Sequence, residues 1–172
     1  EVDPLELIGQ ARWTHVDAAW GGPLRLSATY ANRLAGIEGA DSVAVSAHKL
    51  LMQPKDSALV MFRDPELANS VISFGGGYLA TPNIGVQGSR GAAAVSLLAT
   101  LLALGRAGIV ERIDRVMEMA NQLAENLEGE EAIELLSFPK TGVTVFRPRK
   151  LDTDKIHAKL PPGMFSICLI ED

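Results

Sequence analysis

The first half of the sequence alternates strand-like runs with helical patterns, and this alternation limits the possible folds more than any other feature. Residues 3–12 and 27–40 have the apolar spacing of short helices, and the second pattern closes at glycine. The strand-like runs are WTHV (13–16), DSVAVS (41–46) and SALVMFR (57–63). Alternating strands and helices predict an α/β fold with a mainly parallel sheet covered on both faces.

The second half begins with a long helical pattern from Gly91 to about Leu127, with a break or kink expected around Gly105 and Gly108. Its most apolar stretch, Ala92–Leu104, is shorter than the roughly 20 residues that cross a bilayer, so we expect a buried helix. Between residues 64 and 90 the chain is rich in glycine and is expected to form a long loop.

The last part of the chain reads as a small α+β unit. Asp152 or Thr153 is expected to cap a helix there. The strand-like runs lie at 132–138, 142–148 and 165–170, and the helical run lies at 152–160. We therefore predict two parts, residues 1–127 from a large α/β domain and residues 128–172 from a small α+β domain.

Composition excludes several classes of function. The net charge is −5 and the basic residues are scattered, which disfavours a nucleic-acid surface. The single cysteine, Cys168, rules out an intrachain disulfide, fits a reducing compartment and is expected to be buried in a strand. The opening residues do not resemble a signal peptide. These observations predict a cytoplasmic protein without a membrane partner.

Two charged residues follow strand-like runs, at the positions where open α/β sheets bind their ligands. Asp17 ends the first run, and Lys49 follows the second. If the two strands are neighbours, both residues lie at one crevice. Asp17 could instead cap the next turn, or the two could form a structural salt bridge. Pyridoxal phosphate accounts for both, because it needs a lysine amine for its Schiff base and an acid that keeps its ring nitrogen protonated.

The segments HVDAAWGG (15–22) and GIEGADSVAVSAHKLL (36–51) resemble the group II pyridoxal-phosphate-dependent amino-acid decarboxylases. This family includes decarboxylases of glutamate, aspartate, diaminobutyrate and aromatic amino acids. The resemblance covers nearly the whole chain. It implies a fold-type-I enzyme, in which two subunits build each active site, and so a homodimer acting on an amino acid.

The resemblance also implies roles for individual residues. Lys49 would bind the cofactor covalently, Asp17 would pair with the pyridine nitrogen and Ala19 would pack on the ring face. Ser46 and His48 match positions near the cofactor phosphate. His15 is expected to be a strand residue near the site, and Trp13 and Trp20 to be packing residues.

Two further residues follow in the glycine-rich segment. Tyr78 matches a tyrosine on a mobile loop that closes over a neighbouring subunit's site, where it would act as general acid. The alternative is a surface tyrosine that anchors a turn. Arg90 lies in a Gly-Arg motif before the long helix. It could bind a carboxylate, which would favour a small acidic substrate, or it could simply belong to the helix start.

The resemblance begins in the middle of the family's catalytic domain, and the segment between Tyr78 and Arg90 is short compared with many members. We therefore expect a fragment of a longer enzyme or one chain of a split enzyme. Two alternatives remain at this point. The chain could support another fold-type-I reaction, such as transamination or cysteine desulfuration, or it could be an inactive fragment or partner subunit.

Overall fold

The computed structural model describes residues 3, 5, 11–74, 83–84 and 92–168 of the 172-residue chain. The chain divides into two compact units, Glu1–Arg115 and Val116–Asp172, and each is described by itself. Their boundary lies inside the long helix α2 (Ala93–Glu128). The large-domain and small-domain ranges expected from the sequence, 1–127 and 128–172, stay predictions.

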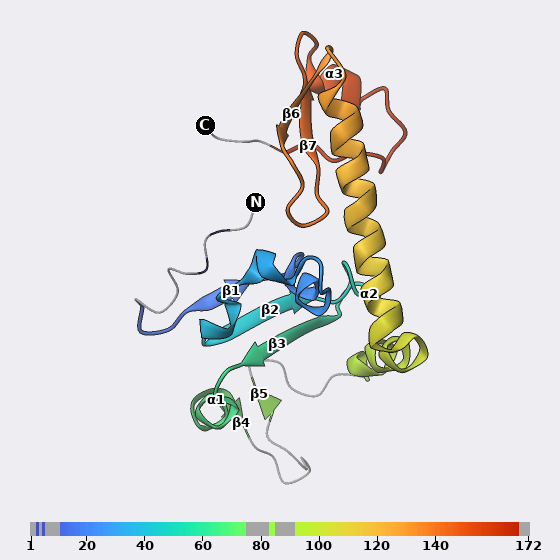
Figure 1. Cartoon of the computed structure of the whole chain (residues 1–172). Helices are drawn as coiled ribbons and strands as arrows, with labels where there is room; N and C mark the ends of the chain where they lie inside the picture. Colours follow the sequence, from blue (N-terminus) through green and yellow to red (C-terminus); the bar gives the residue numbers. More distant parts are fainter. Residues whose placement is uncertain (1–2, 4, 6–10, 75–82, 85–91, 169–172) are drawn as a thin grey trace. The chain divides into compact units, whose positions relative to one another are not determined.

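The first unit contains a three-stranded sheet in the order β1-β2-β3, formed by His15–Asp17, Ser42–Ser46 and Ala58–Phe62 (Figure 1). β1 and β2 are parallel, as predicted, but β3 runs antiparallel to β2. The expectation of a mainly parallel sheet is therefore wrong for β3. A parallel return needs a crossover, usually a helix, and the segment between β2 and β3 contains turns and no helix.

Three short 3₁₀ helices connect β1 to β2, where the sequence predicted one longer helix. They are η2 (Gly22–Leu26), η3 (Ala31–Leu34) and η4 (Ile37–Gly39). Gly36 separates the last two with a φ of 93°, a left-handed conformation that interrupts a regular helix. Leu24 and Leu34 bury their side chains in the core.

A short helix and a small hairpin-like pair follow β3. Helix α1 spans Pro65–Ile72, and Asp64 caps it by accepting a hydrogen bond from the Leu67 N–H at 2.9 Å. β4 (Ser73–Phe74) pairs antiparallel with β5 (Asn83–Ile84). The prediction of an irregular segment is thus wrong over residues 65–72, which form a helix. The Asp64–Pro65 pair before and at its first position is a recognisable helix start.

The kink predicted in α2 is confirmed at Gly105, which has φ 60° and ψ −179° inside the helix. After the kink, Ile109, Ile113 and Met117 recur at helical spacing and are buried. Before it, Leu97 is buried, whereas Leu98 and Leu102 are exposed. The predicted burial of the helix over Ala92–Leu104 is therefore wrong for most of its large apolar side chains.

By length and composition alone, residues Ala94–Glu128 could cross a membrane, with a mean hydropathy of 1.6 in their most apolar window. Core helices of soluble proteins pass the same test, so it carries little weight. The break at Gly105 also separates the most apolar turns from the charged helix that follows.

The second unit contains β6 (Ile133–Ser137) paired antiparallel with β7 (Val145–Pro148). Glu134 lies opposite Arg147, whose Nε donates to the Glu134 carboxylate at 2.8 Å and lowers the pKa of that carboxyl. Helix α3 spans Thr153–His157, and Asp152 is its N-cap residue, whose side chain accepts from the Lys155 N–H, which confirms the predicted cap.

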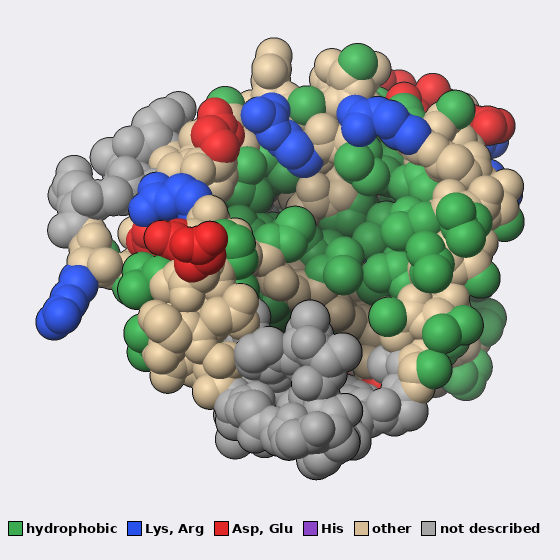
Figure 2. All heavy atoms as spheres, turned by 90° about the horizontal axis from the view of Figure 1, so that it is seen from below, with side chains coloured by type: hydrophobic (Ala, Val, Ile, Leu, Met, Phe, Trp, Pro, Cys, Tyr) green, Lys and Arg blue, Asp and Glu red, His purple; other side chains and the backbone are tan. Residues whose placement is uncertain are grey.

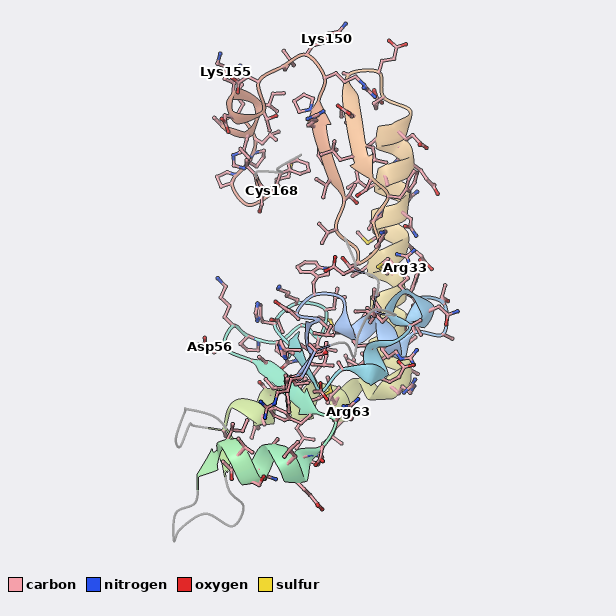
Figure 3. All side chains as sticks on the ribbon, turned by 90° about the vertical axis from the view of Figure 1, so that its left-hand side faces the viewer. Arg33, Asp56, Arg63, Lys150, Lys155 and Cys168 are labelled. Atoms are coloured by element: carbon pink, nitrogen blue, oxygen red, sulfur yellow. The ribbon has the colours of Figure 1, made fainter. Side chains whose placement is uncertain are left out.

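The strand predicted at 165–170 is wrong for residues 165–168, which have no regular structure, and residues 169–170 lie outside the described part. Cys168 is exposed, not buried (Figure 3). Phe165 holds this segment by other means. Its ring packs edge-on against Phe146 at 5.6 Å, and its carbonyl lies 3.0 Å from Nε2 of His157. Side-chain contacts here take the place of strand pairing.

We predict that Gly105→Ala destabilises the protein by about 1–3 kcal/mol, because the φ and ψ of this position are accessible almost only to glycine. Gly129→Ala is the matched control, since its added Cβ meets only ordinary contacts and should change stability by less than about 0.5 kcal/mol. Denaturant unfolding of both variants measures the difference. Equal free energies of unfolding for the two variants would contradict the view that the kink requires glycine at position 105.

Candidate functional site

The candidate site lies where β1 and β2 end side by side. The parallel register places Asp17 opposite Ala44. Pairing continues beyond the strands, because the Ala18 N–H donates to the Ala44 carbonyl at 2.9 Å and the Ser46 N–H donates to the Ala19 carbonyl at 3.1 Å. The residues after Asp17 and after Ser46 therefore leave the sheet at the same edge, as expected for neighbouring parallel strands.

Asp17 has an exposed side chain that is also held locally. Its Oδ1 accepts the Ala19 N–H at 2.9 Å, which closes a tight turn after β1. The cap alternative is thus confirmed as a structural fact. A carboxylate has further lone pairs on both oxygens, so this one bond leaves acceptor capacity facing solvent. Capping the turn and binding a ligand are compatible roles for Asp17.

Lys49 lies in the connection from β2 to β3. Its N–H donates to the Ser46 carbonyl at 3.2 Å, and its own carbonyl accepts from the Met52 N–H at 3.0 Å. Its Nζ lies 5.5 Å from the centre of the Trp20 ring. Such a distance is typical of a cation–π contact. Among the described residues no salt bridge joins Lys49 to Asp17, so the salt-bridge alternative is wrong.

Trp20 is the residue of this edge that the sequence analysis missed, since it was expected only to pack. Trp20 follows Asp17 by three residues. Its ring contacts Lys49, which belongs to the connection after the neighbouring strand β2. A contact between an aromatic face and an ammonium group leaves no periodic signal in the sequence. The one signal in the sequence that could have identified Trp20 is its position just after the end of β1.

The other predicted site residues fall into two groups. Ala19 and Ser46 are half-buried and hydrogen-bonded to each other through their backbones, while His48 is exposed next to Lys49. The structure therefore brings Asp17, Ala19, Ser46, His48 and Lys49 to one edge. Tyr78 and Arg90 lie outside the described residues.

A buried hydroxyl ties the two strands together at their other end. Ser42 is buried at the start of β2, and its Oγ accepts the Nε1–H of Trp13 at 3.0 Å. The same Oγ lies 2.7 Å from Nδ1 of His15. His15 is thus a strand residue that is oriented by Ser42, and Trp13 also packs edge-on against Phe62 at 6.5 Å. Sequence reasoning did not single out Ser42.

A separate apolar groove of about 450 Å³ lies over one face of β2 and β3. Its floor includes the cross-strand pair Val43 and Met61. At its border, Arg25 and Glu38 form an exposed salt bridge of 3.6 Å. Figure 2 shows hydrophobic side chains gathered around a hollow, with charged side chains along one side. A lining of this kind suits apolar packing and is poorly suited to a phosphate group.

Comparison with known proteins gives consistent matches to one family. A sequence profile of the pyridoxal-dependent decarboxylase conserved domain matches residues 3–149. The chain is 34% identical to an aspartate 1-decarboxylase of Aliivibrio fischeri, over 85% of this chain and 28% of that protein. It is 35% identical to an acidic amino acid decarboxylase of Xenopus tropicalis, over 84% of this chain and 32% of that protein.

Solved structures give the same result. Mouse CSAD in its apo form is 31% identical and superposes with a TM-score of 0.68, covering 78% of this chain and 30% of that one. The Oryza sativa TDC structure with PLP and tryptamine is 26% identical, with a TM-score of 0.69, over 81% of this chain and 28% of that one. The chain thus spans about three tenths of the length of the relatives it matches.

We predict that Ser42→Ala destabilises the protein by about 0.5–1.5 kcal/mol, the net contribution of an ordinary hydrogen bond, because it removes the acceptor of the Trp13 indole N–H. Ser70→Ala is the control, since that hydroxyl is exposed and donates only to the Leu67 carbonyl. Thermal or denaturant unfolding, followed by tryptophan fluorescence, compares the two. A Ser42 variant as stable as the Ser70 variant would refute the structural role of this hydroxyl.

Proposed function

This chain belongs to the pyridoxal-dependent decarboxylase family, and we propose that it carries the lysine and aspartate of an amino-acid decarboxylase site. The observation that supports this proposal is the parallel register of β1 and β2. It brings Asp17 and the Lys49 connection to one sheet edge. Strand ends of this kind are where open α/β sheets bind ligands.

The side chains at this edge fit pyridoxal phosphate. Lys49 would hold the cofactor through its amine, which has no salt bridge to Asp17 that would need to be broken. Asp17 would hold a proton on the ring nitrogen, since its carboxylate keeps free acceptor capacity beside the turn bond to Ala19. Ala19 would lie against the ring, and Ser46 and His48 would contribute near the phosphate.

When bound, the cofactor supplies an electron sink for the bond that breaks as carbon dioxide leaves an α-amino acid. The chain's own residues prepare that chemistry. Lys49 is half-buried, and its Nζ lies 5.5 Å from the centre of the Trp20 ring, which would hold the amine at the sheet edge where the cofactor would bind. Asp17 presents a negative charge fixed by its turn. Tyr78 is proposed as the proton donor and Arg90 as a substrate contact.

We further propose an α-amino acid as substrate, in line with the names of the relatives, which act on aspartate, acidic amino acids and L-2,4-diaminobutyrate. A homodimer and a cytoplasmic location complete the proposal. Exposed apolar side chains on β3, such as Val60 and Met61, support association with further protein surface.

We expect borohydride reduction in the presence of pyridoxal phosphate to attach the pyridoxyl group to Lys49, as located by peptide mass spectrometry. Lys49→Ala should abolish both this modification and the visible absorption of the bound cofactor. Lys55→Ala, which removes an exposed lysine of the same connection, should leave both unchanged. Equal labelling of Lys49 and Lys55 in the unaltered protein would argue against the proposed function.

Asp17→Asn tests the acid separately from the turn, because an asparagine oxygen can still accept the Ala19 N–H while the charge is lost. We expect cofactor binding to weaken by about 10- to 100-fold, the range for loss of a hydrogen bond to a charged group. Titration of the visible absorption measures the dissociation constant. Asp56→Asn provides an exposed control, and affinities equal to that control would remove Asp17 from the site.

A further inference from the structure

The connection from β2 to β3, residues 47–57, is closed by its own backbone around Lys49. The Ala47 N–H donates to the Ser57 carbonyl at 2.9 Å, and the Gln53 N–H donates to the Ala47 carbonyl at 3.1 Å. Inside this closed segment, Met52 has a φ of 58°, a left-handed conformation that is costly for a residue other than glycine. The turn that runs from Lys49 to Met52 therefore needs support from its surroundings.

That support comes from the side chain of Gln53, which is only 7% exposed. Its Nε2 donates one hydrogen bond to the Leu51 carbonyl and one to Oγ1 of Thr100, both at 2.9 Å. The first bond braces the turn from within. The second ties the connection to helix α2, an element distant in sequence. Figure 3 labels Asp56 near the start of β3 and Arg63 just beyond its end, which locates this connection relative to the sheet.

Gln53 is a poor choice if stability alone decides the residue at this position. Its Oε1 is buried and has no hydrogen-bond partner among the residues that the structure describes. A buried acceptor without a partner is unfavourable, and an apolar side chain of similar size would avoid it. Departures of this kind from the usual satisfaction of buried polar groups are characteristic of functional sites.

From these observations we infer that Gln53 is a positioning residue, which holds the Lys49 turn in register with β1 by anchoring it to Thr100 of α2. The inference rests on the proposed function, because it concerns the lysine that would bind pyridoxal phosphate. Gln53 touches neither cofactor nor substrate in this role. It acts on Lys49 through the strained turn and so affects the reactivity of one lysine more than that of its neighbours.

The selectivity of labelling between two lysines tests this role. The unaltered protein is treated with pyridoxal phosphate and borohydride, and the initial rates of pyridoxyl attachment at Lys49 and Lys55 are compared by mass spectrometry. Lys55 belongs to the same connection and is exposed, so it reports general accessibility. Gln53→Leu removes both side-chain hydrogen bonds at similar volume. Thr100→Val removes only the bond to α2 and keeps the shape of the side chain.

We expect each substitution to lower the Lys49-to-Lys55 rate ratio by about three- to tenfold, the effect of roughly one hydrogen bond. The double variant should fall no further than Gln53→Leu alone, because Thr100 acts only through Gln53. Folding is checked by circular dichroism, and Thr100→Val keeps the test decisive if Gln53→Leu does not fold. An unchanged ratio in folded Thr100→Val would overturn the inference.

The result for the unaltered protein separates the two proposals. Preferential labelling of Lys49 there, with an unchanged ratio in the variants, leaves the proposed function standing and removes the role of Gln53. Without preference for Lys49 in the unaltered protein, the proposed function and the inference built on it both fail. A ratio that falls in the variants while their unfolding midpoints stay near the original supports positioning over a general structural effect.

Discussion

The hydrogen bonds between β1 and β2 continue past the last strand residues, and the arrangement of the candidate site depends on this continuation. Ala18 bonds back to Ala44, and Ser46 bonds back to Ala19, so the two chains stay in register as they leave the sheet. Because both strands point the same way, Asp17 and Lys49 come to one edge without any direct bond between them. Trp20 then lies close enough to meet the lysine.

The long helix α2 gives this edge its support. Thr100 accepts from Gln53 in the lysine-bearing connection, and Asp114 accepts from the buried Ser27 hydroxyl of the β1–β2 connection at 2.5 Å. Ser27 also accepts from the Thr29 and Tyr30 N–H groups. The segments after β1 and after β2 are therefore both tied to one helix. Asp17 and Lys49 lie on turns. These turns are held by the hydrogen bonds to α2 and by the packing of the buried side chains of Leu24, Leu50 and Leu51.

The sequence predicted those parts of the fold that local patterns control. β-Branched runs located β2 and β3, glycine marked the kink at Gly105, and the N-cap residue Asp152 marked the start of α3. The sequence also predicted that Asp17 and Lys49 lie at one edge of the sheet. Each follows a strand, and neighbouring parallel strands end at the same edge.

The errors concern properties that depend on the surroundings of each segment. The direction of β3 follows from the turns before it, and the exposure of Leu98, Leu102 and Cys168 depends on what covers them. Helix α1 was missed because the glycine-rich stretch after it outweighed the Asp64–Pro65 signal. Contacts between distant residues, such as Lys49 with Trp20 and Gln53 with Thr100, have no local pattern from which they could be predicted.

The turn that holds Asp17 has a thermodynamic consequence for any ligand that meets its carboxylate. Oδ1 already accepts the Ala19 N–H, so the rotamer of this side chain is fixed when the protein folds. A freely rotating carboxylate would lose about 0.5–1.5 kcal/mol of conformational entropy on being immobilised by a ligand. In this protein the side chain already loses that conformational entropy when the chain folds. A cationic group arriving at the edge of the sheet therefore meets an acceptor that is already oriented, and its charge interaction contributes more fully to affinity.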